Sequence, residues 1–143
     1  MALIAGYDRH PASRAALAFA AELAAGLKVP LVVVHVADLS DMVIGSEQPT
    51  SADDRHAELE RQRIDALLAS DVRWSYTLVG GDPVDALIAA AGQYAATMIV
   101  VGRPQQGISA TIGHIVSGAV ARNLVRRSPI PVAVVPEPAD GHR

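Results

Sequence analysis

The chain contains no cysteine among its 143 residues. This absence excludes disulfide bonds, a thiol nucleophile and metal sites built from thiolates. A chain without cysteine fits a reducing compartment, and we expect a cytoplasmic protein.

Aromatic residues are scarce as well, because they make up 3% of a chain that is 50% hydrophobic. The core must therefore be built from alanine, valine, leucine and isoleucine, which suits β-branched strands under alanine-rich helices. The length is that of one domain. We expect this domain to span residues 1–136, followed by a flexible tail at 137–143, where proline, glycine and charged residues dominate.

The chain also lacks a strong charge and a long apolar run. Its formal net charge is −3, which gives no general attraction to nucleic acid or to an anionic membrane. No apolar run approaches the length of a membrane span, and the first residues read as a strand without a basic leader. We therefore expect neither nucleic acid nor a membrane among the partners.

The common catalytic motifs are missing too. There is no G-x-S-x-G, no Walker motif and no G-x-G-x-x-G, so hydrolase, standard NTPase and dinucleotide oxidoreductase functions lack their key residues. The five histidines show no metal-ligand spacing. We predict no catalytic residue and no metal site. His35 is interpreted as a hydrogen-bonded core residue, and Glu58, Glu60 and Asp65 as one charged helix face.

What the chain does have is a regular alternation of strand and helix patterns. Five strands are predicted, at Ala2–Tyr7, Leu31–Val36, Val72–Leu78, Thr97–Val101 and Pro131–Val135. All but one are apolar throughout, as in a buried parallel sheet, whereas Val72–Leu78 alternates and is placed at a sheet edge.

Four helices are predicted between these strands. The first begins at Pro11, with an inward face of Ala16, Ala20, Leu23 and Leu27. The second begins near Ser51, with an inward stripe of Leu59, Gln62 or Arg63, Ala66 and Leu67. The third spans Val84–Tyr94 with Asp82 as its cap, and the fourth runs from about Ile115 to Arg127. Between the second strand and the second helix, Asp38–Thr50 has the composition of a long surface loop.

This alternation predicts an α/β fold, a five-stranded parallel open sheet in the order 3-2-1-4-5 with helices on both faces. In such a sheet, ligands bind outside the carboxyl ends of the strands at the topological switch point, between strands one and four. Asp8 and Gly102 stand at those two ends. Gly102 is expected to end its strand. The stretch from Val100 to Gly107, continued by Ser117–Val120, is either a phosphate-binding loop or a plain turn from strand to helix. Asp8 is either a ligand contact or a cap of the first helix.

The ordered set of segments resembles the universal stress protein family over nearly the full length. The segments are the turn from Asp8 to Leu17, the strand ending at Val36, Gly81–Pro83, Val100–Gly102 and Ser128–Val135. The resemblance implies an adenine nucleotide alpha hydrolase-like sandwich, and for many members it implies ATP, with Mg, in the switch-point cleft.

The resemblance also implies particular binding residues. A first-strand aspartate and a second-strand valine, here Asp8 and Val34, would flank the adenine end. The motif G-x2-G-x9-G-[S/T] would wrap the phosphates, and its positions correspond to Gly102, Gly107, Gly118, Ala119 and Val120.

The chain departs from that motif at three of its positions. Gln105 and Ile115 stand where glycines are expected if Gly102 is the first, and Ala119 replaces the hydroxyl residue. The loss of a hydroxyl removes a ligand for a phosphate or its metal, at a cost of about 1 kcal/mol or more.

Three hypotheses follow from the resemblance and these departures. The first is a non-enzymatic stress-response protein that binds an adenine nucleotide. The second is the same fold without a nucleotide, acting as a protein-interaction module with unknown protein partners. The third is a slow ATP hydrolase, which lacks a base and metal ligands.

The last strand predicts a partner of its own. Val132–Val135 is very apolar, and as a free sheet edge it would invite strand pairing. We expect a homodimer through this strand, in line with the resemblance and with the frequency of two-fold pairs.

Overall fold

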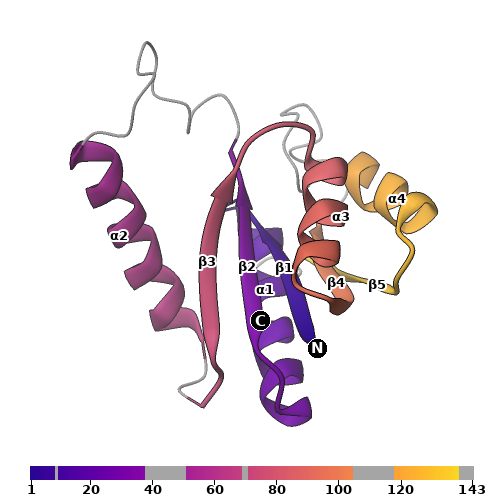
Figure 1. Ribbon diagram of the computed structural model, residues 1–143, viewed down its shortest axis with the longest axis horizontal. Helices are drawn as coiled ribbons and strands as arrows, with labels where there is room; N and C mark the ends of the chain where they lie inside the picture. Colours follow the sequence, from indigo (N-terminus) through magenta and orange to yellow (C-terminus); the bar gives the residue numbers. More distant parts are fainter. Residues whose placement is uncertain (9, 38–50, 69–70, 105–117, 139–143) are drawn as a thin grey trace.

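The structure is a computed structural model, and it describes residues 1–8, 10–37, 51–68, 71–104 and 118–138. Strands and helices alternate along the chain (Figure 1). The elements are β1 (Ala2–Tyr7), α1 (Pro11–Leu27), β2 (Leu31–Val36), α2 (Ser51–Leu67), β3 (Trp74–Val79), α3 (Pro83–Gln93), β4 (Ala96–Arg103), α4 (Gly118–Arg127) and β5 (Val132–Pro136).

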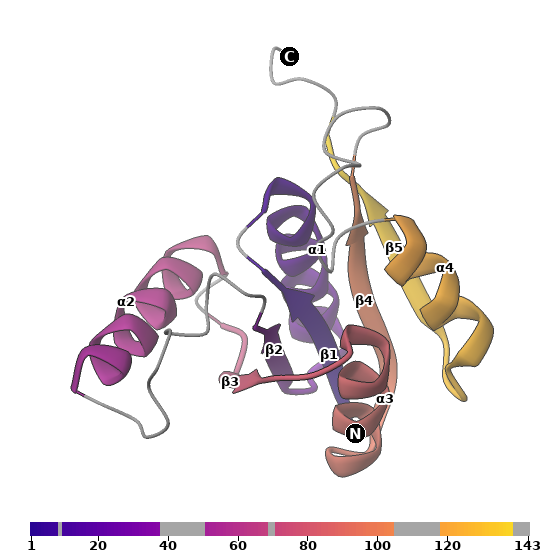
Figure 2. The same ribbon diagram turned by 90° about the horizontal axis from the view of Figure 1, so that it is seen from above.

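The strands form one sheet in the order β3-β2-β1-β4-β5, and every neighbouring pair is parallel. Seen from above, α1 and α2 cover one face and α3 and α4 cover the other (Figure 2). Right-handed crossovers produce this division, because the chain moves outward to β3 over one face and returns to β4 and β5 over the other. The predicted fold class and strand order are confirmed.

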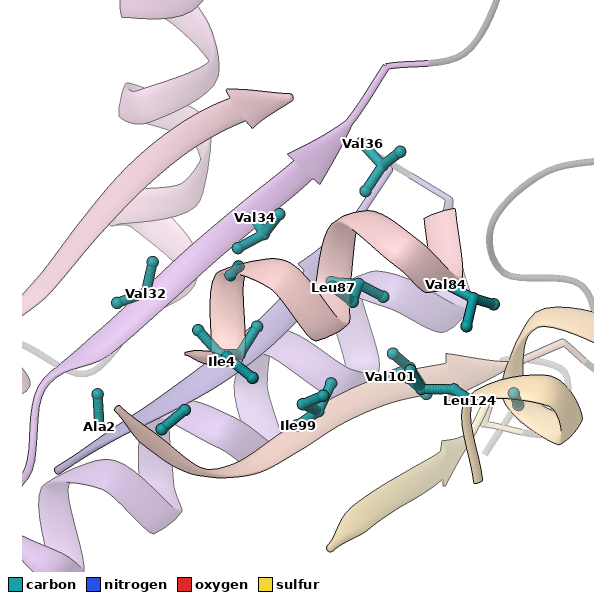
Figure 3. Packing of buried hydrophobic residues seen from close by; sticks show 14 of the residues in the cluster. Ala2, Ile4, Val32, Val34, Val36, Val84, Leu87, Ile99, Val101 and Leu124 are labelled. Atoms are coloured by element: carbon teal, nitrogen blue, oxygen red, sulfur yellow. The ribbon is translucent and has the colours of Figure 1, made fainter. Parts of the chain in front are cut away.

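The core consists of two layers, one on each face of the sheet. Alternate residues of the central strands point to opposite faces, so Ile4, Val34 and Ile99 pack towards α3 and α4 (Figure 3), while Leu3 and Val33 pack towards α1 and α2. All residues of β1 and β2 are buried. This explains why both strands are almost entirely apolar, with His35 as the polar exception in β2.

Helix α1 packs on the sheet through small side chains. Ala16, Ala20 and Ala24 are fully buried, and their size brings the helix close to the strands. The prediction that Leu27 faces inward is wrong, because its side chain is 55% exposed. The buried face ends at Ala24, one turn earlier, and the helix stops at Lys28 in a left-handed conformation with φ of 59°.

Helix α2 faces the sheet with a different side from the predicted one. Leu59 and Leu67 are 50% and 42% exposed, whereas Glu60 and Ile64 are buried. The prediction placed the two leucines, Leu59 and Leu67, on the buried side of the helix because they are apolar. In the structure the buried side instead carries a single apolar residue, Ile64, together with the polar Glu60. The assignment of Glu60 to a charged outer face is wrong for the same reason.

The predicted boundaries of several elements shift by one or two residues, and the predicted start of the fourth helix at Ile115 lies outside the described residues. β3 begins at Trp74 rather than Val72, and it lies at the predicted edge of the sheet. α3 ends at Gln93, and its predicted cap is confirmed by the bond from the Asp85 N–H to the Asp82 carboxylate at 3.0 Å. The described part of the fourth helix begins at Gly118.

Gly102 does not end its strand. β4 continues to Arg103, and Gly102 pairs with Val135 of β5. The pairing extends further, because the Glu137 N–H donates to the carbonyl of Arg103 at 2.8 Å, so the first residue of the predicted tail is held by the sheet. Within the part of the chain that the structure describes, no helix is long and apolar enough to cross a membrane.

Candidate functional site

The carboxyl ends of β1 and β4 lie side by side at the middle of the sheet. The two strands pair directly, with Leu3 opposite Met98 and Ala5 opposite Val100. After β1 the chain leaves over one face through α1, and after β4 it leaves over the other through α4 (Figure 2). The connections diverge here, and this divergence defines the switch point at which open parallel sheets bind ligands.

Asp8 follows β1 directly and is 5% exposed. Its carboxylate oxygen Oδ1 accepts a hydrogen bond from the N–H of His10 at 3.0 Å. The Asp8 N–H donates to Ser13 Oγ at 3.1 Å, and the Ser13 hydroxyl donates to the carbonyl of His10 at 3.0 Å. These three bonds form a closed ring that fixes the turn from β1 into α1. His10 and not Asp8 occupies the N-cap position of α1, so the interpretation of Asp8 as the helix cap is wrong, and its Oδ1 holds the preceding turn instead.

The second carboxylate oxygen of Asp8, Oδ2, is buried, and no described residue offers it a hydrogen bond. A buried carboxylate oxygen needs a donor, because leaving it without one costs a large part of its hydration free energy. The structure therefore combines a rigidly held side chain with an unused acceptor at the switch point. This acceptor suits an N–H or O–H group of a ligand.

Gly102 serves the packing of α1 on β4. A Cβ added at this position would collide with the carbonyl oxygen of Ala12 and would lie 3.0 Å from the Ala12 side chain. Only glycine lets the first turn of α1 approach β4 so closely. The need for glycine here is thus explained without a phosphate, and its predicted ligand role remains a prediction.

The first turn of α4 supplies backbone donors. It contains Gly118, Ala119 and Val120, of which Ala119 is exposed and the other two are partly buried. The first N–H groups of a helix have no partner within it, and they carry the positive end of the helix dipole. A Cβ at Gly118 would meet only the flexible end of Arg122, at 3.2 Å, so no packing contact of the described residues requires glycine there.

Two other predicted site residues stand apart from this arrangement. Val34 is fully buried in the layer under α3 (Figure 3), two residues before the end of β2. Gly107 lies outside the described residues. The structure therefore brings Asp8 and Gly102 to adjacent strand ends and leaves Val34 inside the core.

A buried polar network beside the site was missed by sequence reasoning. The Tyr7 hydroxyl donates to Glu60 Oε2 at 2.7 Å. His35 Nδ1 lies 2.7 Å from the hydroxyl of Tyr76, and the rings of Tyr7 and His35 meet edge to face at 5.4 Å. The prediction of a hydrogen-bonded core histidine is confirmed. The signal for Glu60 was its position one helical turn before Ile64, the residue that α2 buries most completely.

Among the described residues, no group of three or more histidine, aspartate or glutamate side chains is placed to hold a metal ion. The residues at the switch point can accept one hydrogen bond through Asp8 and can donate several through the first turn of α4. Such a set suits binding and orientation of a ligand.

The sequence was also compared with known proteins. A model of the Universal stress protein family matches residues 1–136. Among curated proteins, none matches the sequence significantly.

Several solved structures are similar over nearly the whole chain. A universal stress protein crystallised in complex with cAMP shows 25% sequence identity and a TM-score of 0.64, over 96% of this chain and 98% of that one. A member of the universal stress protein family from Burkholderia pseudomallei shows 26% identity and a TM-score of 0.64, over 94% and 95%. The universal stress protein from Archaeoglobus fulgidus in complex with dAMP shows 20% identity and a TM-score of 0.64, over 94% and 95%, and at this identity it supports the fold alone.

Proposed function

The chain belongs to the universal stress protein family, and from this premise we propose that it binds an adenine nucleotide at the carboxyl ends of β1 and β4. The proposed role is that of a dimeric stress-response or regulatory protein that acts by binding and not by catalysis. The similar protein crystallised with cAMP supports the class of ligand.

The observation that carries the proposal is the Asp8 carboxylate. Its Oδ1 is occupied by the turn into α1, while its buried Oδ2 has no donor among the described residues. An adenine amino group or a ribose hydroxyl supplies such a donor. Because the ring of hydrogen bonds through His10 and Ser13 holds the carboxylate still, little side-chain entropy is lost on binding.

The first turn of α4 is the proposed phosphate end of the site. The backbone N–H groups of Gly118 and Ala119 at the start of α4 favour an anion through hydrogen bonds and the helix dipole. Ala119 offers no hydroxyl to a phosphate or to Mg²⁺, so a metal that accompanies ATP would be held mainly by phosphate oxygens and water. We therefore expect adenine recognition to contribute more to affinity than the triphosphate.

The test is calorimetric titration of the nucleotide-free protein with ATP, with and without Mg²⁺, and with cAMP. Replacing Asp8→Asn removes the charge and should weaken adenine nucleotide binding about tenfold or more, as expected for the loss of a charge-assisted hydrogen bond. The matched control is Asp82→Asn, because the Asp82 carboxylate also accepts a backbone N–H hydrogen bond at the start of a helix but is exposed and lies outside the site.

Equal affinity in Asp8→Asn and the parent protein would place the nucleotide elsewhere. The absence of both heat and nucleotide released by acid from the purified protein would favour the second hypothesis, an interaction module without a nucleotide. An ATP-hydrolysing activity that stays with the protein through purification and is lost in Asp8→Asn would contradict the non-enzymatic role.

The same proposal includes a homodimer through β5. The backbone N–H groups of Val132 and Val134 point away from β4, as the bonds from Ile99 to Pro131 and from Glu137 to Arg103 require. No described residue pairs with this edge through its backbone. On α4, Val125 is 55% exposed and lies on the side opposite Arg127, which contacts Asp85 of α3. An apolar side chain thus flanks the open edge, as an interface between two copies would need.

A further inference from the structure

The other edge of the sheet, formed by β3, is also open. The N–H of Leu31 donates to the carbonyl of Arg73 and that of Ala37 to the carbonyl of Val79, so the odd-numbered residues of β3 bond to β2. The backbone groups of Trp74 and Leu78 therefore point outward, and no described residue bonds to them through its backbone. Charged residues, prolines and bulges usually protect a sheet edge from pairing with another strand. β3 contains none of these three features.

A pocket of about 260 Å³ lies beside this edge, between β3 and α2. Its strand side carries Trp74 and Tyr76, and its helix side carries Glu58 and Asp65. Arg61 lies over the Tyr76 ring, 5.8 Å from its centre, and Asp65 accepts a bond from the Trp74 indole at 3.3 Å. The pocket thus combines two aromatic rings with two carboxylates and one resident cation.

The position of α2 decides what fits along β3. Helix α2 covers one face of the sheet and lies beside β3 in both views (Figures 1 and 2). A second copy that paired antiparallel with β3 would place its own α2 on the same face, because the two-fold axis of such a pair is perpendicular to the sheet. The two helices would then meet over the new strand pair. A single extended segment without a helix of its own avoids this conflict.

We propose that β3 adds an extended segment of a partner protein as a sixth strand, with a lysine or arginine side chain of that segment in the pocket between Glu58 and Asp65. The backbone groups of Trp74 and Leu78 supply the pairing, which is the usual mode of strand addition. Specificity comes from the pocket, because its two carboxylates exceed its single cation and its rings favour a cationic group. The surface is separate from the nucleotide site and does not depend on it.

The test uses the full chain and a defined probe, an octapeptide of alternating threonine and valine with one central lysine. We expect the peptide to shift the amide resonances of Trp74 and Leu78 in a two-dimensional NMR titration. It should bind at least fivefold more tightly than the same peptide with glutamate in place of lysine. The double variant Glu58→Gln with Asp65→Asn should remove that preference, and both side chains are exposed, so the fold is retained.

A backbone variant separates strand pairing from simple charge attraction. Leu78→Pro removes an outward N–H and no bond to β2, and it should weaken the peptide at least tenfold, while Leu78→Thr keeps the N–H and should bind within twofold of the parent. If Leu78→Pro fails to fold, the lysine peptide with methylated amides on the side facing β3 gives the same comparison. Nucleotide binding should be equal in all these variants.

Three results would overturn the proposal. One is the absence of any shift at β3 up to the solubility limit, and another is equal affinity for the lysine and glutamate peptides. The third is concentration-dependent broadening at β3 without peptide, because it would assign the edge to a second copy of the chain.

Discussion

At the scale of single residues, Asp8 and Gly102 were predicted from the sequence as ligand-binding positions, and both also have a structural role in the fold. Asp8 holds the turn into α1 with one oxygen, and its other oxygen has no donor among the described residues. Gly102 admits the first turn of α1 against β4, so its packing role can be tested apart from any binding role.

We expect Gly102→Ala to lower the free energy of unfolding by about 3 kcal/mol, because the added Cβ forces α1 and β4 apart in a closely packed region. The measurement is urea unfolding followed by circular dichroism. The control is Gly26→Ala, where a Cβ meets nothing within 4 Å and where the helix should gain up to about 1 kcal/mol. If Gly102→Ala lowers the free energy of unfolding by less than about 1 kcal/mol, α1 and β4 can move apart at little cost and the close packing does not require glycine.

At the scale of elements, α2 is held to the sheet by few side chains. Ile64 is its one fully buried apolar residue among those described, and Glu60 adds the bond from Tyr7 at the carboxyl end of β1. A buried carboxylate that accepts a hydrogen bond from a hydroxyl constrains the rotation of the helix as well as its position, because turning the helix about its axis would break the bond.

A double-mutant cycle tests this contact. Tyr7→Phe and Glu60→Gln should each destabilise the protein by about 1–3 kcal/mol, and their combination should cost less than the sum by about 1 kcal/mol or more. Arg63→Ala is the control, because Arg63 is exposed and its contact with Glu60 is 3.5 Å long, so its effect should stay below about 1 kcal/mol. Strict additivity of the first two substitutions would mean that the bond does not fix α2.

At the scale of the whole molecule, the sheet has two open edges of different character. β5 is apolar and ends at Pro136, and the preceding helix α4 carries the exposed Val125. β3 is flanked by α2 and by a pocket with carboxylates. We propose that the β5 edge pairs with another copy of the chain and that the β3 edge pairs with an extended segment of a partner protein.

The dimer can be tested at its backbone. Val134→Pro removes an N–H that points outward from β5 and no bond to β4, so we expect a folded monomer. Val134→Thr keeps the N–H and should remain dimeric at the same concentration. Sedimentation velocity distinguishes the two, and a Val134→Pro dimer would place the interface on another surface.

The order and type of the elements, the fold class and the edge position of β3 could all be predicted from the sequence. These follow from local signals, such as unbroken apolar runs in strands buried on both faces, the alternation around Trp74 and the Asp82 cap. The same reasoning located the switch point, because strand order fixes which carboxyl ends are adjacent.

Three features became visible only in the folded chain. They are the buried side of α2, the close packing that requires glycine at position 102, and the oxygen of Asp8 that has no donor among the described residues. Each of these depends on the approach of segments far apart in the chain: Glu60 to Tyr7, Ala12 to Gly102, and α2 to the edge of β3. The periodicity of the sequence indicates which side of a helix or strand is apolar. Which residues of another element that side contacts depends on how the elements pack across the sheet, and a local sequence pattern does not carry this information.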